Sequence, residues 1–92
     1  MIFEWDPSKS QMNEEKHGID FEAAKCLWED PDRMEILASY PLENRIVLIG
    51  TIHRQLWTAI YTRRGKAVRI ISVRRSRSKE KVLYEKEKFC AK

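Results

Sequence analysis

The sequence predicts a single α+β domain over residues 1–92, with an antiparallel sheet of about four strands, two N-terminal helices and a C-terminal helix. A chain of 92 residues is the size of one domain. Its composition, 42% hydrophobic and 35% charged, is typical of a folded protein with a heavily charged surface. Helical patterns lie near both ends of the chain and strand patterns lie between them, which favours an antiparallel sheet with the helices grouped on one side.

A short strand over residues 2–5 and a polar helix over residues 7–17 begin the predicted fold. Asp6 suits the N-cap of this helix, a proline follows at the first helical position, and Gly18 can adopt the left-handed conformation that ends a helix. Met12 is the only apolar residue in the body of the helix. Burial therefore stabilises it little, and another property must select its polar residues.

A second helix is predicted over residues 21–29, because apolar residues recur there at helical spacing and Asp20 can cap its start. Residues 34–38 are a candidate strand, and residues 40–44 form a turn around a proline.

Three stronger strand patterns follow, over residues 46–49, 57–62 and 68–73. The first is continuously apolar, which predicts a central strand of the sheet. Residues 63–66 fit a hairpin turn between the last two strands. The C-terminal helix starts at a cap provided by Ser76 or Ser78. Its apolar positions are sparse: Val82, Leu83, Phe89 and Cys90.

Several classes of protein are excluded by what the chain contains. No apolar run approaches the roughly 20 residues that span a bilayer, and the first residues do not form a secretory signal, so a cytoplasmic protein is expected. Cys26 and Cys90 each fall in a predicted helix and do not make a disulfide framework. His17 and His53 lack ligand spacing to either cysteine, and no metal or cofactor is predicted.

Charge is distributed very unevenly along the chain. Residues 1–46 hold eleven acidic and five basic residues, a charge of −6, whereas residues 47–92 hold three acidic and thirteen basic residues, a charge of +10. Nine basic residues and one acidic residue lie between Arg63 and Lys81. Such a concentration indicates a polyanion or an acidic partner.

Four blocks of residues share their order and spacing with a known family. They are Phe3-Glu4-Trp5-Asp6-Pro7 with Lys9, Asn13 with Lys16-His17-Gly18-Ile19, Glu43 and Arg45 with Ile49-Gly50, and Arg69-Ile70-Ile71-Ser72 with Arg74, Glu80 and Tyr84-Glu85. Together they resemble the BrnT toxin family. The resemblance implies a RelE-like fold and a ribonuclease toxin from a bacterial type II toxin–antitoxin pair. It also implies a BrnA-like, DNA-binding antitoxin that neutralises the toxin, in a hetero-oligomer such as 2:2.

Cleavage of RNA without a metal needs one group to take the proton of the 2′-hydroxyl, one to stabilise the charge on the phosphorane and one to protonate the leaving oxygen. Arginine suits the second task, and Arg69, Arg74 and Arg75 are the candidates. In a regular strand Arg69 and Arg75 share one face, roughly 20 Å apart, and Arg74 points to the other. We therefore favour Arg74, beside the polar Ser72, as a catalytic residue, whereas Arg69 equally fits a paired structural arginine.

The other candidate catalytic residues are His17, Lys9 and Tyr84. The charge of histidine changes nearest to neutral pH, which suits proton transfer, but in the last turn of a helix His17 also suits a contact with the final carbonyl groups. Lys9 fits either an active-site charge or a solvated one. Tyr84 can stack on a base, donate a proton or pack against the sheet. RNA-binding residues are predicted among the remaining basic side chains: Arg75, Arg77, Arg63, Arg64, Lys66 and Lys16.

Two functions remain open on these residues. One is a metal-independent endoribonuclease whose basic half is covered by an acidic segment of the antitoxin. The other is a non-catalytic module that binds nucleic acid or an antitoxin through the same basic surface. Charge and composition do not separate the two, and the family resemblance favours the first. A DNA-binding repressor is disfavoured because no helix-turn-helix, zinc-finger or ribbon-helix-helix signature is found.

Overall fold

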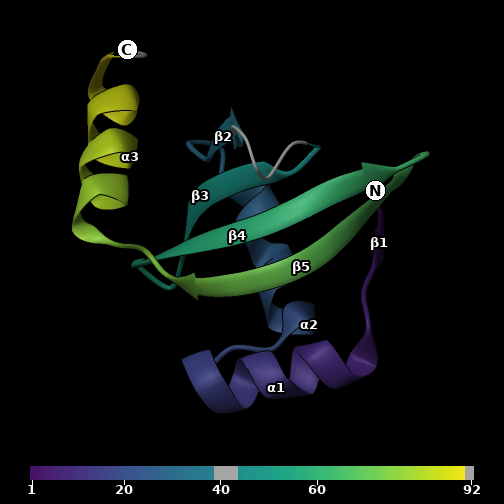
Figure 1. The fold of residues 1–92 in the computed structure, drawn as a ribbon. Helices are drawn as coiled ribbons and strands as arrows, with labels where there is room; N and C mark the ends of the chain where they lie inside the picture. Colours follow the sequence, from purple (N-terminus) through teal and green to yellow (C-terminus); the bar gives the residue numbers. More distant parts are fainter. Residues whose placement is uncertain (39–43, 91–92) are drawn as a thin grey trace.

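A computed structural model describes residues 1–38 and 44–90 and confirms the α+β fold (Figure 1). Most of the turn predicted over residues 40–44 lies outside the described residues. In chain order the elements are β1 (Ile2–Glu4), α1 (Pro7–His17), α2 (Phe21–Ala24), the 3₁₀ helix η1 (Lys25–Glu29), β2 (Met34–Leu37), β3 (Ile46–Ile52), β4 (Gln55–Arg64), β5 (Ala67–Arg75) and α3 (Ser78–Cys90).

Helix α1 and the helical segment over residues 21–29 begin and end at the predicted positions. The carboxylate of Asp6 accepts a hydrogen bond from the backbone N–H of Ser8 at 2.9 Å, and Gly18 ends α1 with a φ of 80°. Asp20 caps the second helix by accepting from the N–H of Ala23 at 2.8 Å. This segment is an α-helix over only its first four residues and then tightens into η1.

The sheet has five strands in the described part of the chain, in the order β1-β5-β4-β3-β2. Strands β2 to β5 pair antiparallel, but β1 runs parallel to β5, with Ile2 beside Ala67 and Glu4 beside Arg69. The prediction of about four antiparallel strands is therefore corrected to a mixed sheet of five. The sequence of a three-residue strand does not indicate its direction. Here β1 pairs with the edge of β5 that β4 leaves unpaired, and it runs parallel to β5.

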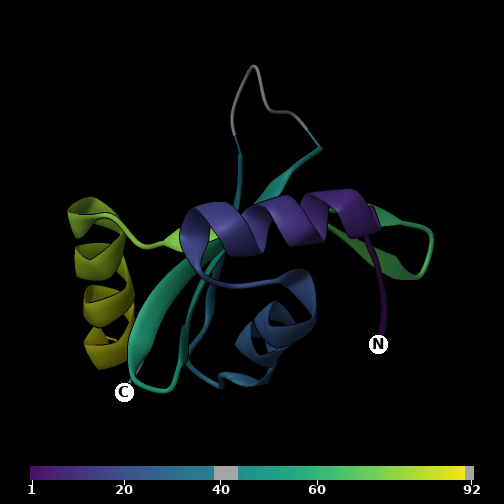
Figure 2. The ribbon, with the colours of Figure 1, turned by 90° about the horizontal axis from the view of Figure 1, so that it is seen from below.

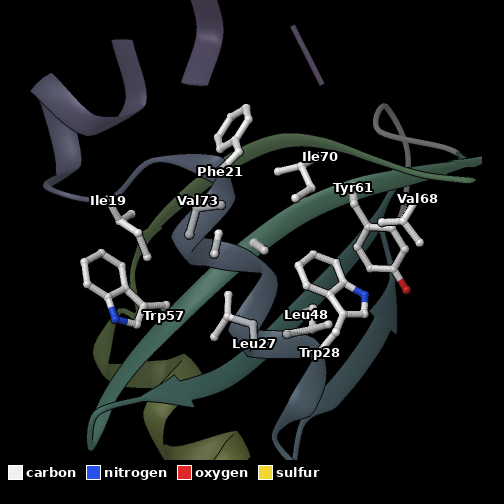
Figure 3. Packing of buried hydrophobic residues seen from close by; sticks show 12 residues of the cluster. Ile19, Phe21, Leu27, Trp28, Leu48, Trp57, Tyr61, Val68, Ile70 and Val73 are labelled. Carbon is white, nitrogen blue, oxygen red and sulfur yellow. The ribbon is translucent and has the colours of Figure 1, made fainter. Parts of the chain in front are cut away.

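The hydrophobic core lies between the sheet and the helical segment formed by α2 and η1 (Figure 3). Phe21 and Leu27 from this segment are fully buried, as are Tyr61 of β4 and Val73 of β5. The Trp28 ring meets the Tyr61 ring edge-on, with centroids 5.2 Å apart. The face of the sheet toward these helices is thus the buried one, and the opposite face is free for polar side chains.

The other two helices do not lie together. Helix α1 runs along the edge of the sheet at β5, whereas α3 stands at the end of the sheet where β5 ends (Figures 1 and 2). The expected grouping of all helices on one side is therefore wrong for α3, whose sparse apolar residues are too few to cover a sheet face. Among the described residues, no helix has the length and apolar character needed to cross a membrane.

The start of α3 is fixed by an acidic residue inside the helix. The carboxylate of Glu80 reaches back and accepts from the N–H of Arg77, the residue before the helix, at 2.7 Å. Ser78 is the first helical residue, and the hydroxyl of Ser76 pairs with that of Thr58 at 2.8 Å. Neither serine is the cap that the sequence predicts, because Arg77 occupies the position before the first helical residue.

Candidate functional site

A β-bulge in β5 changes which of its residues share a face of the sheet. Ile60 of β4 pairs with Ser72, but the next residue, Tyr61, pairs with Ile70, so Ile71 is an extra residue in β5. The buried residues of β5 confirm the shift, because their spacing changes from two to three at the bulge: they are Val68, Ile70 and Val73. The regular alternation assumed for this strand is therefore wrong.

The bulge places Arg69 and Arg74 on the same outer face of the sheet, each opposite a threonine of β4. Arg75 stands opposite Trp57, and its guanidinium lies 5.3 Å from the centroid of the Trp57 ring. The predicted pairing of Arg69 with Arg75 on one face is thus corrected. Arg69 and Arg74 remain roughly 15 Å apart along the strand, which is too far for both to bind one phosphate.

Helix α1 is held against the edge of β5 by polar side chains. The amide nitrogen of Asn13 donates to the carbonyl of Val73 at 2.9 Å and to that of Ile19 at 2.8 Å, and its amide oxygen accepts from the N–H of Val73 at 3.1 Å. Asn13 is only 7% exposed, and the hydroxyl of Ser10 accepts from the N–H of Phe21 at 2.9 Å. These bonds explain the polar character of α1, because hydrogen bonding to a strand edge and a loop replaces apolar burial.

An open groove of about 470 Å³ runs between α1 and the bulge of β5. The strand contributes the bulged Ile71 and Ser72, and the helix contributes the remaining lining residues: Lys9, Met12, Asn13, Glu15, Lys16 and His17. Three of the predicted functional residues, Lys9, Lys16 and His17, are thereby brought together on one surface. Two ammonium groups beside an imidazole can bind a phosphate and exchange a proton with it.

Arg74 lies outside this groove and is held by Glu80. Its guanidinium donates two hydrogen bonds to the carboxylate, at 2.7 and 2.8 Å, while Thr58 donates a third at 3.0 Å. The side chains of Arg74 and Glu80 are 24% and 17% exposed. The bonds from Arg74 hold the pKa of Glu80 at about 2, against the effect of burial. This ion pair ties the end of β5 to the first turn of α3.

Arg69 and Tyr84 also have carboxylate partners. The guanidinium of Arg69 lies 3.5 Å from the carboxylate of Glu4 on the neighbouring β1. Tyr84 is 4% exposed and donates to the carboxylate of Asp30 at 2.8 Å, and burial followed by this bond raises the pKa of Tyr84 to about 12. The contact of Arg69 corresponds to the paired structural arginine that the sequence allowed, whereas the bond of Tyr84 to Asp30 was not predicted.

The basic residues predicted to bind RNA form two separate groups. Arg63, Arg64 and Lys66 are exposed around the β4–β5 turn, where Gly65 has a φ of 61°. Arg75 and Arg77 are exposed at the opposite end of β5, about 25 Å away for an extended strand of this length. One phosphate cannot contact both groups, but a strand of several nucleotides can.

Carboxylates, thiols and imidazoles do not gather into a metal centre in the described part of the chain. No group of three or more histidine, cysteine, aspartate or glutamate residues there could hold a metal ion. The groove itself contains one carboxylate, from Glu15, beside two lysines, which is a poor ligand set for magnesium or calcium.

The fold and the groove together define a small α+β domain that presents lysine and histidine side chains along a sheet edge. Residues 5–80 match the family described as ribonuclease toxin, BrnT, of type II toxin–antitoxin system. The chain belongs to this family. Comparison with curated proteins gave no match. Family membership identifies a ribonuclease toxin that has an antitoxin partner.

Chemical reasoning from the sequence gave no role to two residues that hold the ends of β5 and its neighbouring helices in place, Asn13 and Glu80. A signal existed for each of them. Asn13 stands in a helix with almost no apolar face, and Glu80 is the single acidic residue among nine basic ones between Arg63 and Lys81. A lone opposite charge within such a run indicates an ion pair.

Proposed function

We propose that this chain is a metal-independent endoribonuclease and that cleavage takes place in the groove between α1 and β5. The observation that carries the proposal is that Lys9, Lys16 and His17 line one groove with the bulged Ile71 and its neighbour Ser72. Sequence periodicity on α1 and the bulge on β5 are independent features, and both bring polar side chains to the same surface. β-Bulges are common next to active sites because they redirect side chains.

In the proposed reaction the 2′-oxygen of the RNA attacks the adjacent phosphorus. The bond to the 5′-oxygen of the next nucleotide breaks, which leaves a 2′,3′-cyclic phosphate and a free 5′-hydroxyl. The 2′-hydroxyl loses a proton and the leaving oxygen gains one, and His17 carries out one of these transfers. Lys9 and Lys16 stabilise the additional negative charge on the phosphorane oxygens.

The remaining predicted site residues are assigned different roles in this proposal. Arg69, Arg74 and Tyr84 support the site through their bonds to Glu4, Glu80 and Asp30. The exposed cations at the two ends of β5 bind flanking phosphates of the RNA: Arg75, Arg77, Arg63, Arg64 and Lys66.

The antitoxin that the family implies is proposed to be a BrnA-like, DNA-binding protein. Its acidic surface would cover the basic half of this chain, with its charge of +10, and so block access of RNA. We propose a hetero-oligomer such as 2:2 as the neutralised form, located in the cytoplasm.

Purified protein is expected to cleave single-stranded RNA equally well with and without EDTA, because no step of the proposed reaction passes through a metal ion. The measurement is the rate of product formation on a denaturing gel, with the antitoxin complex as the inactive control. Activity that disappears in EDTA and returns with magnesium would contradict metal independence. Binding of RNA without cleavage in either buffer would favour the non-catalytic module instead.

A further inference from the structure

We propose that the outer face of α3 around Val82 is the docking site for an apolar, acidic segment of the antitoxin. The proposal rests on the proposed function, because it takes the antitoxin as the partner. Val82 and Leu83 are 63% and 41% exposed, although both are large aliphatic residues. The inner side of the same helix is fixed to Arg74 of β5 through Glu80, and to Asp30 at the end of η1 through Tyr84. The helix therefore presents a defined surface to a partner.

Two shallow hollows flank Val82, and their walls combine apolar and cationic groups. The first, of about 410 Å³, is completed by Ser78, Lys79 and Leu83. The second, of about 560 Å³, is completed by Lys81, Glu85 and Lys86. Lysine stems supply apolar wall while their ammonium groups remain at the rim. This shape suits aliphatic side chains on both sides of Val82.

The positive charge around the two hollows favours an acidic segment as the binding partner. Three lysines, Lys79, Lys81 and Lys86, surround the hollows, against one carboxylate, that of Glu85. Arg77, another exposed cation, precedes the helix. A complementary segment carries aliphatic residues at helical spacing and carboxylates beside them, so that each ammonium group meets an opposite charge.

A second copy of this chain is a poorer occupant for the same surface. In an antiparallel pair centred on Val82 and Leu83, Lys79 of one copy lies beside Lys86 of the other. In a parallel pair each lysine meets its own counterpart. Both arrangements bring like charges together where the apolar contact forms, and such juxtaposition disfavours binding.

Val82→Lys tests the surface, with Leu37→Lys as the matched control, because Leu37 is 78% exposed on β2, far from α3 in sequence. Affinity for the purified antitoxin is measured by titration calorimetry, and RNA cleavage by the free protein is measured in parallel. Loss of one buried aliphatic contact and addition of a like charge are expected to weaken binding at least tenfold. The control is expected to bind within about twofold of the parent protein.

A second variant, Lys79→Glu with Lys86→Glu, places carboxylates at the rim of the hollows. Its affinity for the antitoxin is expected to fall below that of the parent protein, and the difference is expected to grow as salt is lowered.

The outcomes separate this proposal from the proposed function. Unchanged antitoxin binding by both α3 variants, each with a normal thermal unfolding curve, would overturn the docking site and leave the ribonuclease proposal intact. Absence of RNA cleavage by the parent protein would overturn the ribonuclease proposal and leave the binding result valid. A dimer of the free parent protein that Val82→Lys converts to a monomer would show that a second copy is the occupant, contrary to the proposal.

Discussion

Replacing His17 with alanine is expected to slow RNA cleavage by roughly 10²–10⁴-fold, the usual contribution of a positioned proton-transfer group. His17 lines the same groove as Lys9, Lys16 and Ser72, and the proposed reaction takes place on a phosphodiester bound there. The measurement is the single-turnover rate of cleavage with protein in excess over RNA. Under these conditions the rate reports chemistry rather than binding or product release.

Gln11→Ala is the matched control for this prediction, because Gln11 is an exposed residue of the same helix that does not line the groove. Both variants are expected to keep the thermal unfolding curve of the parent protein. If His17→Ala cleaves RNA as fast as Gln11→Ala, the histidine acts only on the final carbonyl groups of α1. Proton transfer would then have to be assigned to another group.

Arg74→Ala is expected to lower the free energy of unfolding by about 1–3 kcal/mol at neutral pH, less than for a fully buried ion pair because this pair is partly exposed. The substitution leaves the carboxylate of Glu80, 17% exposed, without its charged partner. Arg75→Ala is the matched control, because Arg75 is exposed and its guanidinium lies over the ring of Trp57. That substitution is expected to cost about 0.5–1 kcal/mol. Urea unfolding of the three proteins measures both effects.

The difference between the parent protein and Arg74→Ala is expected to shrink in acid. The bonds from Arg74 depress the pKa of Glu80 from 4.5 to about 2 in the folded state. A carboxylate whose pKa is lower in the folded than in the unfolded state stabilises the fold at pH values above its unfolded-state pKa. This stabilisation is lost as the pH falls through its folded-state pKa. The difference should therefore be full near neutral pH and decline between about pH 4.5 and 2. A difference that is independent of pH would mean that the ion pair is not its source.

Activity of the Arg74→Ala variant alone cannot distinguish a catalytic role from a structural one, because an unfolded protein is also inactive. Arg74→Met combined with Glu80→Met removes both charges and leaves no unpaired carboxylate, a change that is often neutral for stability. If this double variant folds and cleaves RNA at the parent rate, Arg74 is structural. A folded double variant with a loss of 10²-fold or more would restore Arg74 as a residue that contacts the phosphate.

The ends of the first two helices could be predicted from the sequence because they depend on local chemistry. Asp6, Gly18 and Asp20 act within a few residues of their own positions, and each does what its side chain and backbone favour. The direction of β1 and the position of α3 depend instead on contacts between residues far apart in the chain. Glu4 lies beside Arg69, and Tyr84 bonds to Asp30, and no local pattern encodes these pairs.

The candidate site was predicted in part for the same reason. His17, Lys9 and Lys16 lie on one helix, where spacings of seven and eight residues return to the same side. The side of the groove formed by β5 could not be predicted. The extra residue Ile71 changes which face of the sheet the later side chains of this strand point to. Without this extra residue, Arg69 and Arg74 would point to opposite faces of the sheet. With it they share one face, and Ile71 and Ser72 lie against α1.

The most direct test is to map where RNA binds on the ¹⁵N-labelled protein with a short 2′-O-methyl RNA, which lacks the attacking hydroxyl and is not cleaved. The largest backbone amide shifts are expected along the groove, at Lys9, Lys16, His17, Ile71 and Ser72. Smaller shifts are expected at the cations of the β4–β5 turn. Shifts confined to that turn or to α3, with the groove amides unchanged, would contradict a ribonuclease site between α1 and β5.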